Sequence, residues 1–301
     1  MVTLPSDVAL PHQFSMNFAI ATNDGYQCVL EAFLGAGWDL QKLFVSPESW
    51  MSSNKQVIAR ALELGANVQH SPITSYDLTD LGQRGCATLI IAAYDWKIPG
   101  WRPDLKYAVN FHPSPLPEGR GPYPLVRAIL EGRSSWAVTC HLLNERFDEG
   151  DILDAEYFDI DSDECHESLR LKTQMAAGRL AGRVVKEFEV LCNSTKPQGP
   201  GSYWVRWSEQ DRTIDFTQPI EVIMRQIRAF GDLECVATIN EAKVYIHRAK
   251  GWHAFHSART GAVVHASNLA LVVAAGDGFI AITEWSFNPP GAVAAKLRCG
   301  N

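Results

Sequence analysis

The sequence predicts an α/β fold, in which a Rossmann-like open, mostly parallel sheet is followed by a smaller C-terminal β-barrel (OB-like) domain. Over the first two thirds of the chain, short apolar runs alternate with helical segments, the pattern of a parallel sheet covered by helices on both faces. A segment rich in Pro, Gly and Ser, residues 193–203, then interrupts this pattern. Short strand-like runs separated by tight turns follow it. We therefore expect an N-terminal extension at 1–15, a first domain at 16–192, a linker at 193–203 and a β-rich domain at 204–301.

The predicted elements of the first domain follow from the spacing of apolar residues. Two of the helices run into a glycine, which can adopt the left-handed conformation that ends a helix. The glycines of "LGAGWDL" (34–40) follow a helix rather than a strand and lack the third glycine, so we reject a dinucleotide-binding fingerprint. The expected elements are strands at 17–22, 40–46, 68–73, 87–94, 107–112, 137–143 and 154–160, and helices at 26–37, 54–66, from near Pro124, and at 168–192.

The C-terminal part has a different pattern. Residues 219–230 have the spacing of one amphipathic helix. Strand-like runs then occur at 234–239, 242–252, 261–266 and 269–285, and the last of these contains the tight turn "AAGDGF" (274–279), a strong hairpin signal.

Composition and charge exclude several classes of protein. The 301 residues are 46% hydrophobic and contain no run of 18 or more apolar residues, so we expect no membrane span. The N-terminus lacks the basic start and apolar core of a signal peptide. The seven cysteines are scattered and form no C-x-x-C pair, which favours a reducing, cytoplasmic location over a disulfide framework or a structural zinc site. A formal net charge of −7 argues against a protein whose main role is to bind nucleic acid.

The candidate chemistry lies at the end of the predicted strand 107–112. Asn110 and His112 are two residues apart, so on a strand their side chains point to the same side, and three prolines restrict the loop that follows. Ligands of open α/β sheets bind beyond the carboxyl ends of the strands. An amide donor and a titratable imidazole would then face one space. For an isolated N-x-H pair, a turn-forming Asn and a capped loop histidine would be the better interpretation.

The 40 residues that follow this pair favour a functional role over that interpretation. In order, they contain N-x-H-P-S-x-L-P-x-x-R-G-x-x-P-x-x-x-A-I-x-x-G, then V-T-x-H, then D-x-G-D-I-L. This pattern resembles the 10-formyltetrahydrofolate-dependent formyltransferase family, which includes glycinamide ribonucleotide, methionyl-tRNA and amino-sugar N-formyltransferases. The resemblance extends upstream to "AAYDWKIP" (92–99). Downstream, 211–230 and 276–285 look like the C-terminal domain of the methionyl-tRNA and sugar branches.

The resemblance implies a catalytic set of Asn110, His112 and Asp148 and a catalytic domain at 16–192. The acceptor is a primary amine that attacks the formyl carbon. Asn110 would donate a hydrogen bond to the resulting oxyanion, protonated His112 would add a second and move protons, and Asp148 would orient and charge the imidazole. Taken alone, the acidic run 148–151 would be better explained as a solvated turn. A metal site with His112 and His141 lacks the usual ligand spacing, so we expect no metal.

The resemblance also implies 10-formyltetrahydrofolate as co-substrate. Its slot would be lined by Tyr94, Trp96, Lys97 and Ile98 together with the 142–148 loop. The alternative, that Tyr94 and Trp96 only pack the end of the sheet, is equally weighted. His141 is expected to pack or to support the site rather than to catalyse. The full set of expected cofactor-binding residues is Tyr94, Trp96, Lys97, Ile98, Ser114, Leu116 and Asp148. For Ser114 and Leu116, which belong to the signature loop, the alternative is that they shape the pocket rather than contact substrate.

The acceptor is expected to be a small amine, either a nucleotide-linked amino sugar or an amino-acid derivative. Methionyl-tRNA formyltransferases carry a glycine- and basic-rich insertion after the second strand, whereas the equivalent stretch here, 46–66, has two basic residues and no such insertion. Methionyl-tRNA stays open as an acceptor. Two other functions also stay open, a hydrolase that uses water as the acceptor and a non-catalytic protein that binds folate or a nucleotide. The chain is also a possible homodimer. The aromatic segment "YWVRW" (203–207) is expected to pin the linker rather than to stack on an acceptor base.

Overall fold

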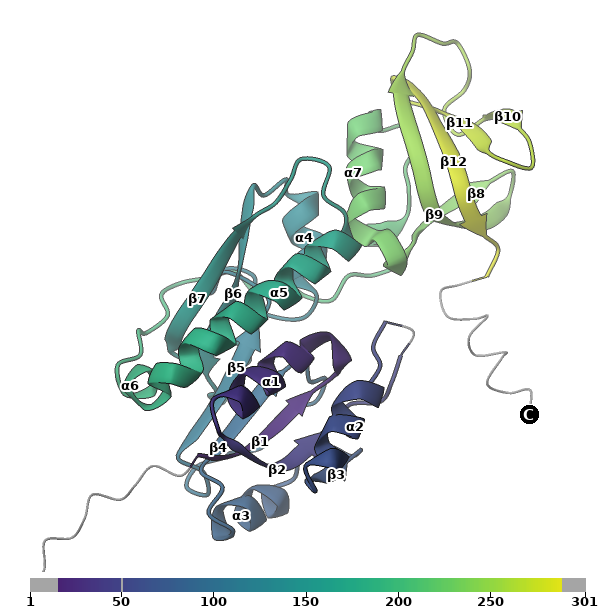
Figure 1. Ribbon diagram of the computed structural model, residues 1–301. Helices are drawn as coiled ribbons and strands as arrows, with labels where there is room; N and C mark the ends of the chain where they lie inside the picture. The colour runs from purple at the N-terminus through teal and green to yellow at the C-terminus, as the bar shows by residue number, and fades with distance from the viewer. Residues whose placement is uncertain (1–15, 50, 289–301) are drawn as a thin grey trace, which may run out of the picture.

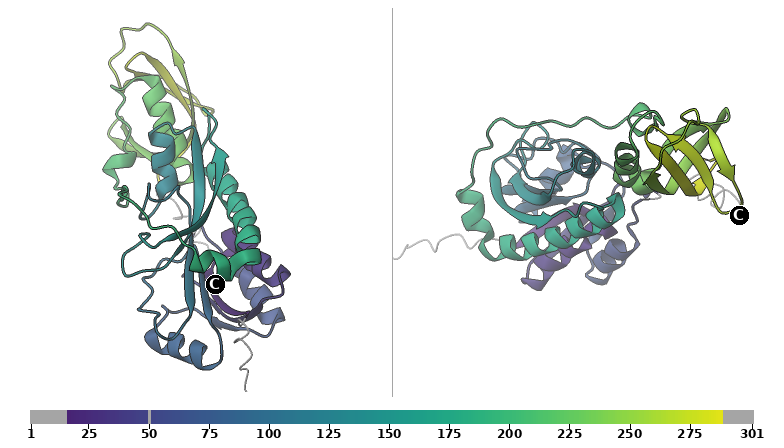
Figure 2. Two further views of the ribbon diagram at one scale, coloured as in Figure 1. Left: turned by 90° about the vertical axis from the view of Figure 1, so that its left-hand side faces the viewer. Right: turned by 90° about the horizontal axis from the view of Figure 1, so that it is seen from above.

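The computed structural model describes residues 16–49 and 51–288, which form two sheets joined by helices (Figure 1). The predicted N-terminal extension, 1–15, lies outside the described residues. Between the two sheets lies α7 (Ile220–Phe230), and the C-terminal sheet occupies one end of an elongated molecule (Figure 2).

The larger sheet has seven strands in the order β3-β2-β1-β4-β5-β6-β7. The first five pair in parallel, and β6 runs antiparallel to both of its neighbours, so the predicted mostly parallel sheet is confirmed. The strands are β1 (Asn17–Thr22), β2 (Asp39–Phe44), β3 (Asn67–Gln69), β4 (Thr88–Ala92), β5 (Tyr107–His112), β6 (Ser135–Leu142) and β7 (Ile152–Asp159).

Helices cover both faces of this sheet, as the alternation along β1 requires. Phe18 and Ile20 belong to the core beneath the helices of one face, whereas Ala19 and Ala21 belong to the core on the other face. Successive strand residues point to opposite faces, so a strand with helices on both sides must be apolar throughout. On the first face lie α1 (Gln27–Gly35), α2 (Lys55–Glu63), α5 (His166–Val184) and α6 (Phe188–Asn193), and on the second lies α3 (Ser75–Gln83).

Two helical predictions need correction. The prediction contained no helix at α3, although Thr74 and Asp77 form a capping box there, each side chain bonding to the other residue's backbone N–H. The long helix expected at 168–192 is interrupted by a 3₁₀ turn at Val185–Glu187. Beyond this turn, Phe188 packs edge-on against Trp38 at 5.0 Å between ring centroids. A helix continued through the turn would point a different set of side chains at the core.

The smaller sheet is antiparallel with the order β10-β11-β12-β9-β8, and α7 packs against it. The predicted hairpin is confirmed, since Ala275 pairs with Gly278 across a two-residue turn. The β-rich domain is confirmed too, but among the described residues β8 and β10 are the two edge strands and do not pair with each other, so this is an open sheet rather than a closed barrel. Its strands are β8 (Cys235–Ile239), β9 (Ala242–His253), β10 (Val263–Ala266), β11 (Leu271–Ala275) and β12 (Gly278–Ser286).

One apolar core joins the two sheets and includes α4 (Pro124–Leu130), whose start near Pro124 was predicted. Trp204 stacks on Trp136 of β6 at 5.7 Å with 14° between the rings. Trp207 meets Phe230 of α7 edge-on at 5.6 Å. The prediction that the aromatic segment pins the linker is therefore confirmed for these two tryptophans.

Burial of His166, the first residue of α5, gives the fold a pH-dependent stability. The side chain is 4% exposed, and its Nδ1 has no hydrogen-bond partner. Burial lowers the pKa of His166 to about 4, with Arg170 adding to this effect and Glu167 opposing it. The unfolded chain, with a histidine pKa of about 6.5, therefore binds more protons below that pH, and stability falls as the pH drops toward 4.

We predict that His166→Leu reduces, by on the order of 1–2 kcal/mol, the unfolding free energy that wild type loses between about pH 7 and pH 5. The Tm measured across that range checks it. His265→Leu, at an exposed position of β10, is the control and keeps the wild-type slope. An unchanged slope in His166→Leu would contradict the assignment.

Candidate active site

A cavity of about 440 Å³ lies beyond the carboxyl ends of β4 and β5. Parallel strands of an open sheet present their ligands at this edge. The walls come from the loops after β4 and β6 and from the loop that joins β5 to α4. The lining includes residues 93–98, 110–113, 121–124 and 143–148, together with His141 and Tyr203.

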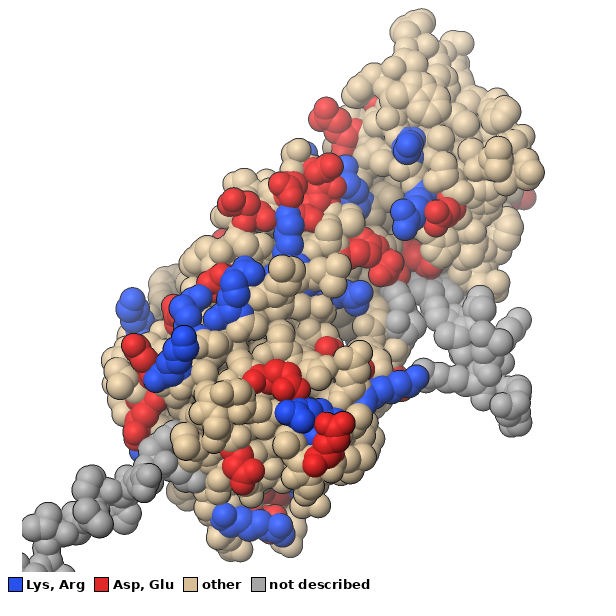
Figure 3. Space-filling view, viewed as in Figure 1, with Lys and Arg blue, Asp and Glu red and all other residues tan. Residues whose placement is uncertain are grey.

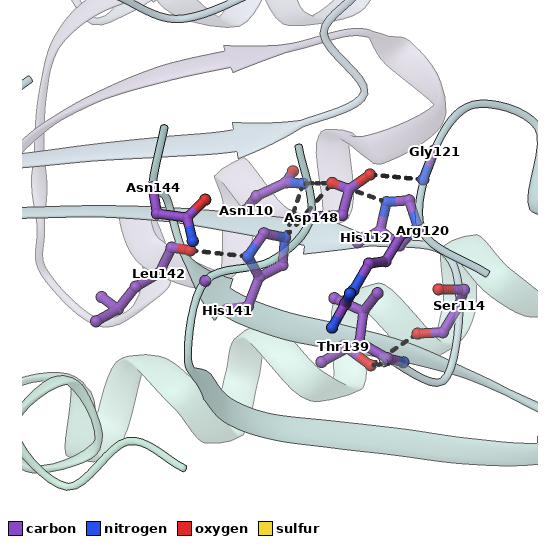
Figure 4. A network of polar contacts seen from close by, with 12 residues as sticks. Asn110, His112, Ser114, Arg120, Gly121, Thr139, His141, Leu142, Asn144 and Asp148 are labelled. Carbon is purple, nitrogen blue, oxygen red and sulfur yellow. Dashed lines mark hydrogen bonds and ion pairs between the residues drawn. The ribbon is translucent and has the colours of Figure 1, made fainter. Parts of the chain in front are cut away.

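Asn110 and His112 both face this cavity, as the strand spacing predicted. Asn110 Nδ2 lies 3.3 Å from Asp148 Oδ1 and 3.2 Å from His141 Nε2 (Figure 4). His141 Nδ1 lies 2.8 Å from the Leu142 carbonyl oxygen, which can only accept, so Nδ1 carries the proton. In the neutral ring Nε2 is then an acceptor for the Asn110 amide. His141 thus helps to hold Asn110 in place.

Asp148 is the centre of this polar network (Figure 4). Its Oδ1 lies 3.4 Å from His112 Nδ1, and its Oδ2 accepts a 2.9 Å hydrogen bond from the Gly121 amide. Burial of the carboxylate alone would raise its pKa. The positive charge of His112, the interactions with His141 and the Gly121 hydrogen bond outweigh burial and lower the pKa of Asp148 to about 2. The carboxylate is therefore ionised at neutral pH.

His112 has an acceptor opposite each ring nitrogen. Nε2 lies 2.9 Å from the Gly119 carbonyl oxygen and must donate to it, while Nδ1 faces Asp148. Burial lowers the pKa of His112, and the Asp148 charge and the Gly119 hydrogen bond oppose that effect. A proton taken up on Nδ1 would find a carboxylate already in position to stabilise it.

The loop that carries Asp148 depends on a glycine two residues later. A Cβ at Gly150 would lie 1.6 Å from the Leu142 carbonyl oxygen, so the chain can pass this strand end only without a side chain. Asp148 itself has a φ of 57°, in the left-handed region that a non-glycine residue seldom adopts. The surrounding contacts must therefore hold it in this conformation.

The loop after His112 shapes the cavity rather than lining it with Ser114 and Leu116, in keeping with the second of the two roles considered for it. Both residues are buried and are not among the cavity-lining residues, and their contact with the cofactor stays a prediction. Ser114 Oγ donates to the Glu118 carbonyl at 2.8 Å. Thr139 Oγ1 donates to the Ser114 carbonyl and accepts from the Leu116 amide. These bonds turn the two side chains inward, so they shape the loop that presents Gly121.

The four residues expected on the cofactor side, Tyr94, Trp96, Lys97 and Ile98, all line the cavity. Tyr94 also packs the sheet end, because its hydroxyl accepts a 2.9 Å hydrogen bond from the Ile73 amide and its ring meets Trp96 edge-on at 5.4 Å. The two interpretations offered for Tyr94 and Trp96 are therefore compatible. Lys97 is exposed at the rim.

Tyr203, the last residue of the predicted linker, lines the cavity and is 53% exposed. The whole segment 203–207 was expected to pin the linker, because nothing in the sequence shows that Tyr203 lies next to Gly121, some 80 residues away. Within residues 16–49 and 51–288, no group of three or more His, Cys, Asp or Glu side chains is arranged to hold a metal ion. The same part of the chain has no helix that is long and apolar enough to cross a membrane.

Comparison with known families accounts for this arrangement. Residues 102–185 match the model described as "Formyl transferase", and residues 206–295 match "Formyl transferase, C-terminal domain". The two matches follow the order of the two sheets and together cover more than half of the chain. The chain belongs to the formyltransferase family.

Curated relatives of this formyltransferase-family chain include two methionyl-tRNA formyltransferases. The one from Janthinobacterium sp. is 29% identical over 65% of this chain and 64% of its own length. The one from Coprothermobacter proteolyticus is 32% identical over 56% of each chain. The matched part thus spans less than two thirds of the length of these relatives.

Solved structures share the fold at low sequence identity. HypX from Aquifex aeolicus superposes with a TM-score of 0.69 at 15% identity, over 94% of this chain and 48% of that one. The N-formyltransferase from Helicobacter canadensis, in complex with folinic acid and dTDP-3-aminofucose, superposes with a TM-score of 0.67 at 19% identity, over 90% of this chain and 99% of that one.

Proposed function

We propose that this chain transfers the formyl group of 10-formyltetrahydrofolate to the primary amine of a small acceptor, a nucleotide-linked amino sugar or an amino-acid derivative. The observation that carries the proposal is the convergence of Asn110, His112 and Asp148 on one cavity at the sheet edge. Family membership supports it. The Helicobacter canadensis structure contains folinic acid and an amino-sugar nucleotide, and one HypX structure contains tetrahydrofolic acid.

The proposal also assigns a role to each part of the chain. Residues 16–192 form the catalytic domain, 193–203 the linker and 204–301 the C-terminal domain. Within the cavity, Tyr94, Trp96, Lys97 and Ile98 form the wall for the folate. Aromatic and apolar side chains there suit a planar pterin, and backbone groups of the 143–148 loop can bond its edge.

In the reaction, Asn110 stabilises the oxyanion that forms when the amine attacks the formyl carbon. Its Nδ2 contacts with Asp148 and His141, at 3.3 and 3.2 Å, are long for N–H hydrogen bonds. One N–H can turn toward the developing negative charge while the other contact keeps the amide in place. Stabilising charge that appears only in the transition state accelerates the reaction without tightening substrate binding.

His112 and Asp148 move the protons. The attacking nitrogen becomes positively charged and must lose a proton, and the departing folate nitrogen must gain one. His112 can take up the first proton and supply the second, and the Asp148 carboxylate stabilises the imidazolium between these events. Burial lowers the pKa of His112, which makes the proton easier to release once it has been taken up.

Surface charge supports a small acceptor over tRNA. On the face of Figure 3, a row of Lys and Arg side chains follows α5, and Asp and Glu side chains lie beside it. Along α5, Arg183 pairs with Asp154 and Arg179 with Glu156, both acids of β7. Lys172 pairs with Asp161, in the segment after β7. Paired cations contribute little to a phosphate-binding surface. Methionyl-tRNA is the second candidate acceptor, because the curated relatives named above are methionyl-tRNA formyltransferases.

We predict which acceptor supports turnover. Tetrahydrofolate release from 10-formyltetrahydrofolate, followed by absorbance, is expected to depend on a nucleotide-linked amino sugar or an ornithine-type amine and not on methionyl-tRNA. Release with methionyl-tRNA alone would support the second candidate. An equal rate in buffer would identify a hydrolase. Folate binding without release under every condition would contradict the proposed activity.

We also predict how substitutions in the catalytic set change turnover. Asn110→Ala is expected to lower kcat on the order of 100- to 1000-fold, with the folate dissociation constant nearly unchanged, because one oxyanion donor is lost. Asp148→Asn keeps the shape of the side chain, removes its charge, and is expected to abolish turnover. Asp163→Asn, at an exposed position outside the cavity lining, is the control and keeps activity. Near-wild-type turnover in Asp148→Asn would overturn the mechanism.

A further inference from the structure

Residues 196–204, here called the strap, are bonded to both loops that build the catalytic network. At one end, Lys196 pairs with Ile152 through two backbone hydrogen bonds of 2.8 and 2.9 Å. At the other end, the Arg120 amide donates to the Ser202 carbonyl at 3.0 Å, and the Trp204 amide donates to the Arg120 carbonyl at 2.7 Å. The strap therefore runs from the loop after Asp148 to the loop that contains Gly121. A flexible connection would make no such bonds.

Gln198 lies between these two anchor points and uses its whole hydrogen-bonding capacity. Its Nε2 donates to the carbonyls of Asp148, at 2.9 Å, and Gly150, at 2.6 Å. Its Oε1 accepts from Nε and Nη2 of Arg120, at 3.1 and 2.9 Å. Carbonyls only accept and guanidinium groups only donate, so the side-chain amide has one possible orientation. Only an amide side chain can serve both neighbours at once.

These bonds close a ring around the catalytic carboxylate. From the Asp148 carbonyl the ring passes through Gln198 to Arg120, and from there along the chain to Gly121. It returns through the hydrogen bond from the Gly121 amide to Asp148 Oδ2. Both the backbone and the side chain of Asp148 are therefore fixed. A left-handed conformation is unfavourable for a non-glycine residue and persists where its surroundings hold it, as this ring does at Asp148.

We propose that Gln198 is a positioning residue, which holds Asp148 against His112 and Asn110 from outside the cavity. The inference rests on the proposed function, because it assigns Gln198 to the same reaction. It makes the strap part of the active site, although Gln198 itself does not line the cavity. Gly199 of the strap also helps to fix Arg120, since its carbonyl accepts a hydrogen bond from Arg120 Nη2 at 3.0 Å.

The test uses Gln198→Met, which keeps the length of the side chain and removes all four hydrogen bonds without adding charge. Gln226→Met is the matched control. Gln226 lies on α7, and its Nε2 likewise donates to two backbone carbonyls, those of Asp211 and Thr213, at 2.9 and 3.1 Å. It is not among the cavity-lining residues. Gln198→Glu is the second variant, because a carboxylate can keep the Arg120 contact but cannot donate to the carbonyls.

Two readouts are compared. The first is the titration midpoint of the His112 ring by NMR, assigned with His112→Asn and measured without substrate. Because the Asp148 charge raises the pKa of His112, a displaced carboxylate lowers this midpoint. The second is kcat with KM for 10-formyltetrahydrofolate. A catalytic group displaced by about 1 Å can cost on the order of 100-fold in rate.

We expect Gln198→Met to lower the His112 midpoint and to reduce kcat on the order of 10- to 100-fold, with KM nearly unchanged. Gln198→Glu is expected not to restore kcat, and Gln226→Met to match wild type in both readouts. An unchanged His112 midpoint in Gln198→Met would overturn the proposal, as would rescue by Gln198→Glu, an equal loss in Gln226→Met, or an unfolded Gln198→Met chain. If wild type transfers no formyl group, the proposed function fails, and the NMR readout still decides whether Gln198 positions Asp148.

Discussion

The ionised carboxylate of Asp148 is the interaction on which the site depends. Its side chain is 11% exposed, and its two oxygens contact four residues from three different segments of the chain. Asn110 and His112 come from β5, His141 from β6 and Gly121 from the loop before α4. A buried carboxylate is costly unless it is paired and hydrogen-bonded. The loops are therefore held in the arrangement that satisfies this charge, and the same arrangement gives His112 a partner for its proton.

The C-terminal domain is fixed close to this charge. Trp204 stacks on Trp136, and its amide bonds to the Arg120 carbonyl, one residue before the glycine that donates to Asp148. A Cβ at Gly121 would lie 2.5 Å from the Trp204 carbonyl oxygen, so close approach of the two segments requires glycine at this position. Packing between the two sheets and the geometry of the active site are thus coupled through two neighbouring backbone contacts.

What the sequence could predict was local or periodic. The alternation of strands and helices, the glycine-ended helices and the Gly276-Asp277 hairpin each follow from a short stretch of chain. Asn110 and His112 could be paired because strand side chains repeat every two residues. The two roles considered for Ser114 and Leu116 could not be told apart, because the prolines show that the loop is restricted but not which way its side chains turn. That direction is set by Thr139, on another strand.

Contacts between distant segments could not be predicted in this way. Gln198 lies 50 residues from Asp148 and 78 from Arg120, in a segment whose composition is typical of a flexible linker. Its role depends on three-dimensional hydrogen bonding that no local pattern encodes. The left-handed φ of Asp148 is similar, because its sequence neighbours alone predict an ordinary turn. Such exceptions to local preference are expected where function imposes its own geometry.

The most direct test of the account is the titration of the His112 ring by NMR in wild type and in Asp148→Asn. The account places an ionised carboxylate against the ring, where it opposes the effect of burial on the pKa of His112. Removing that charge should therefore move the titration midpoint to lower pH. A midpoint that stays the same or rises in Asp148→Asn would contradict the claim that Asp148 controls the charge of His112.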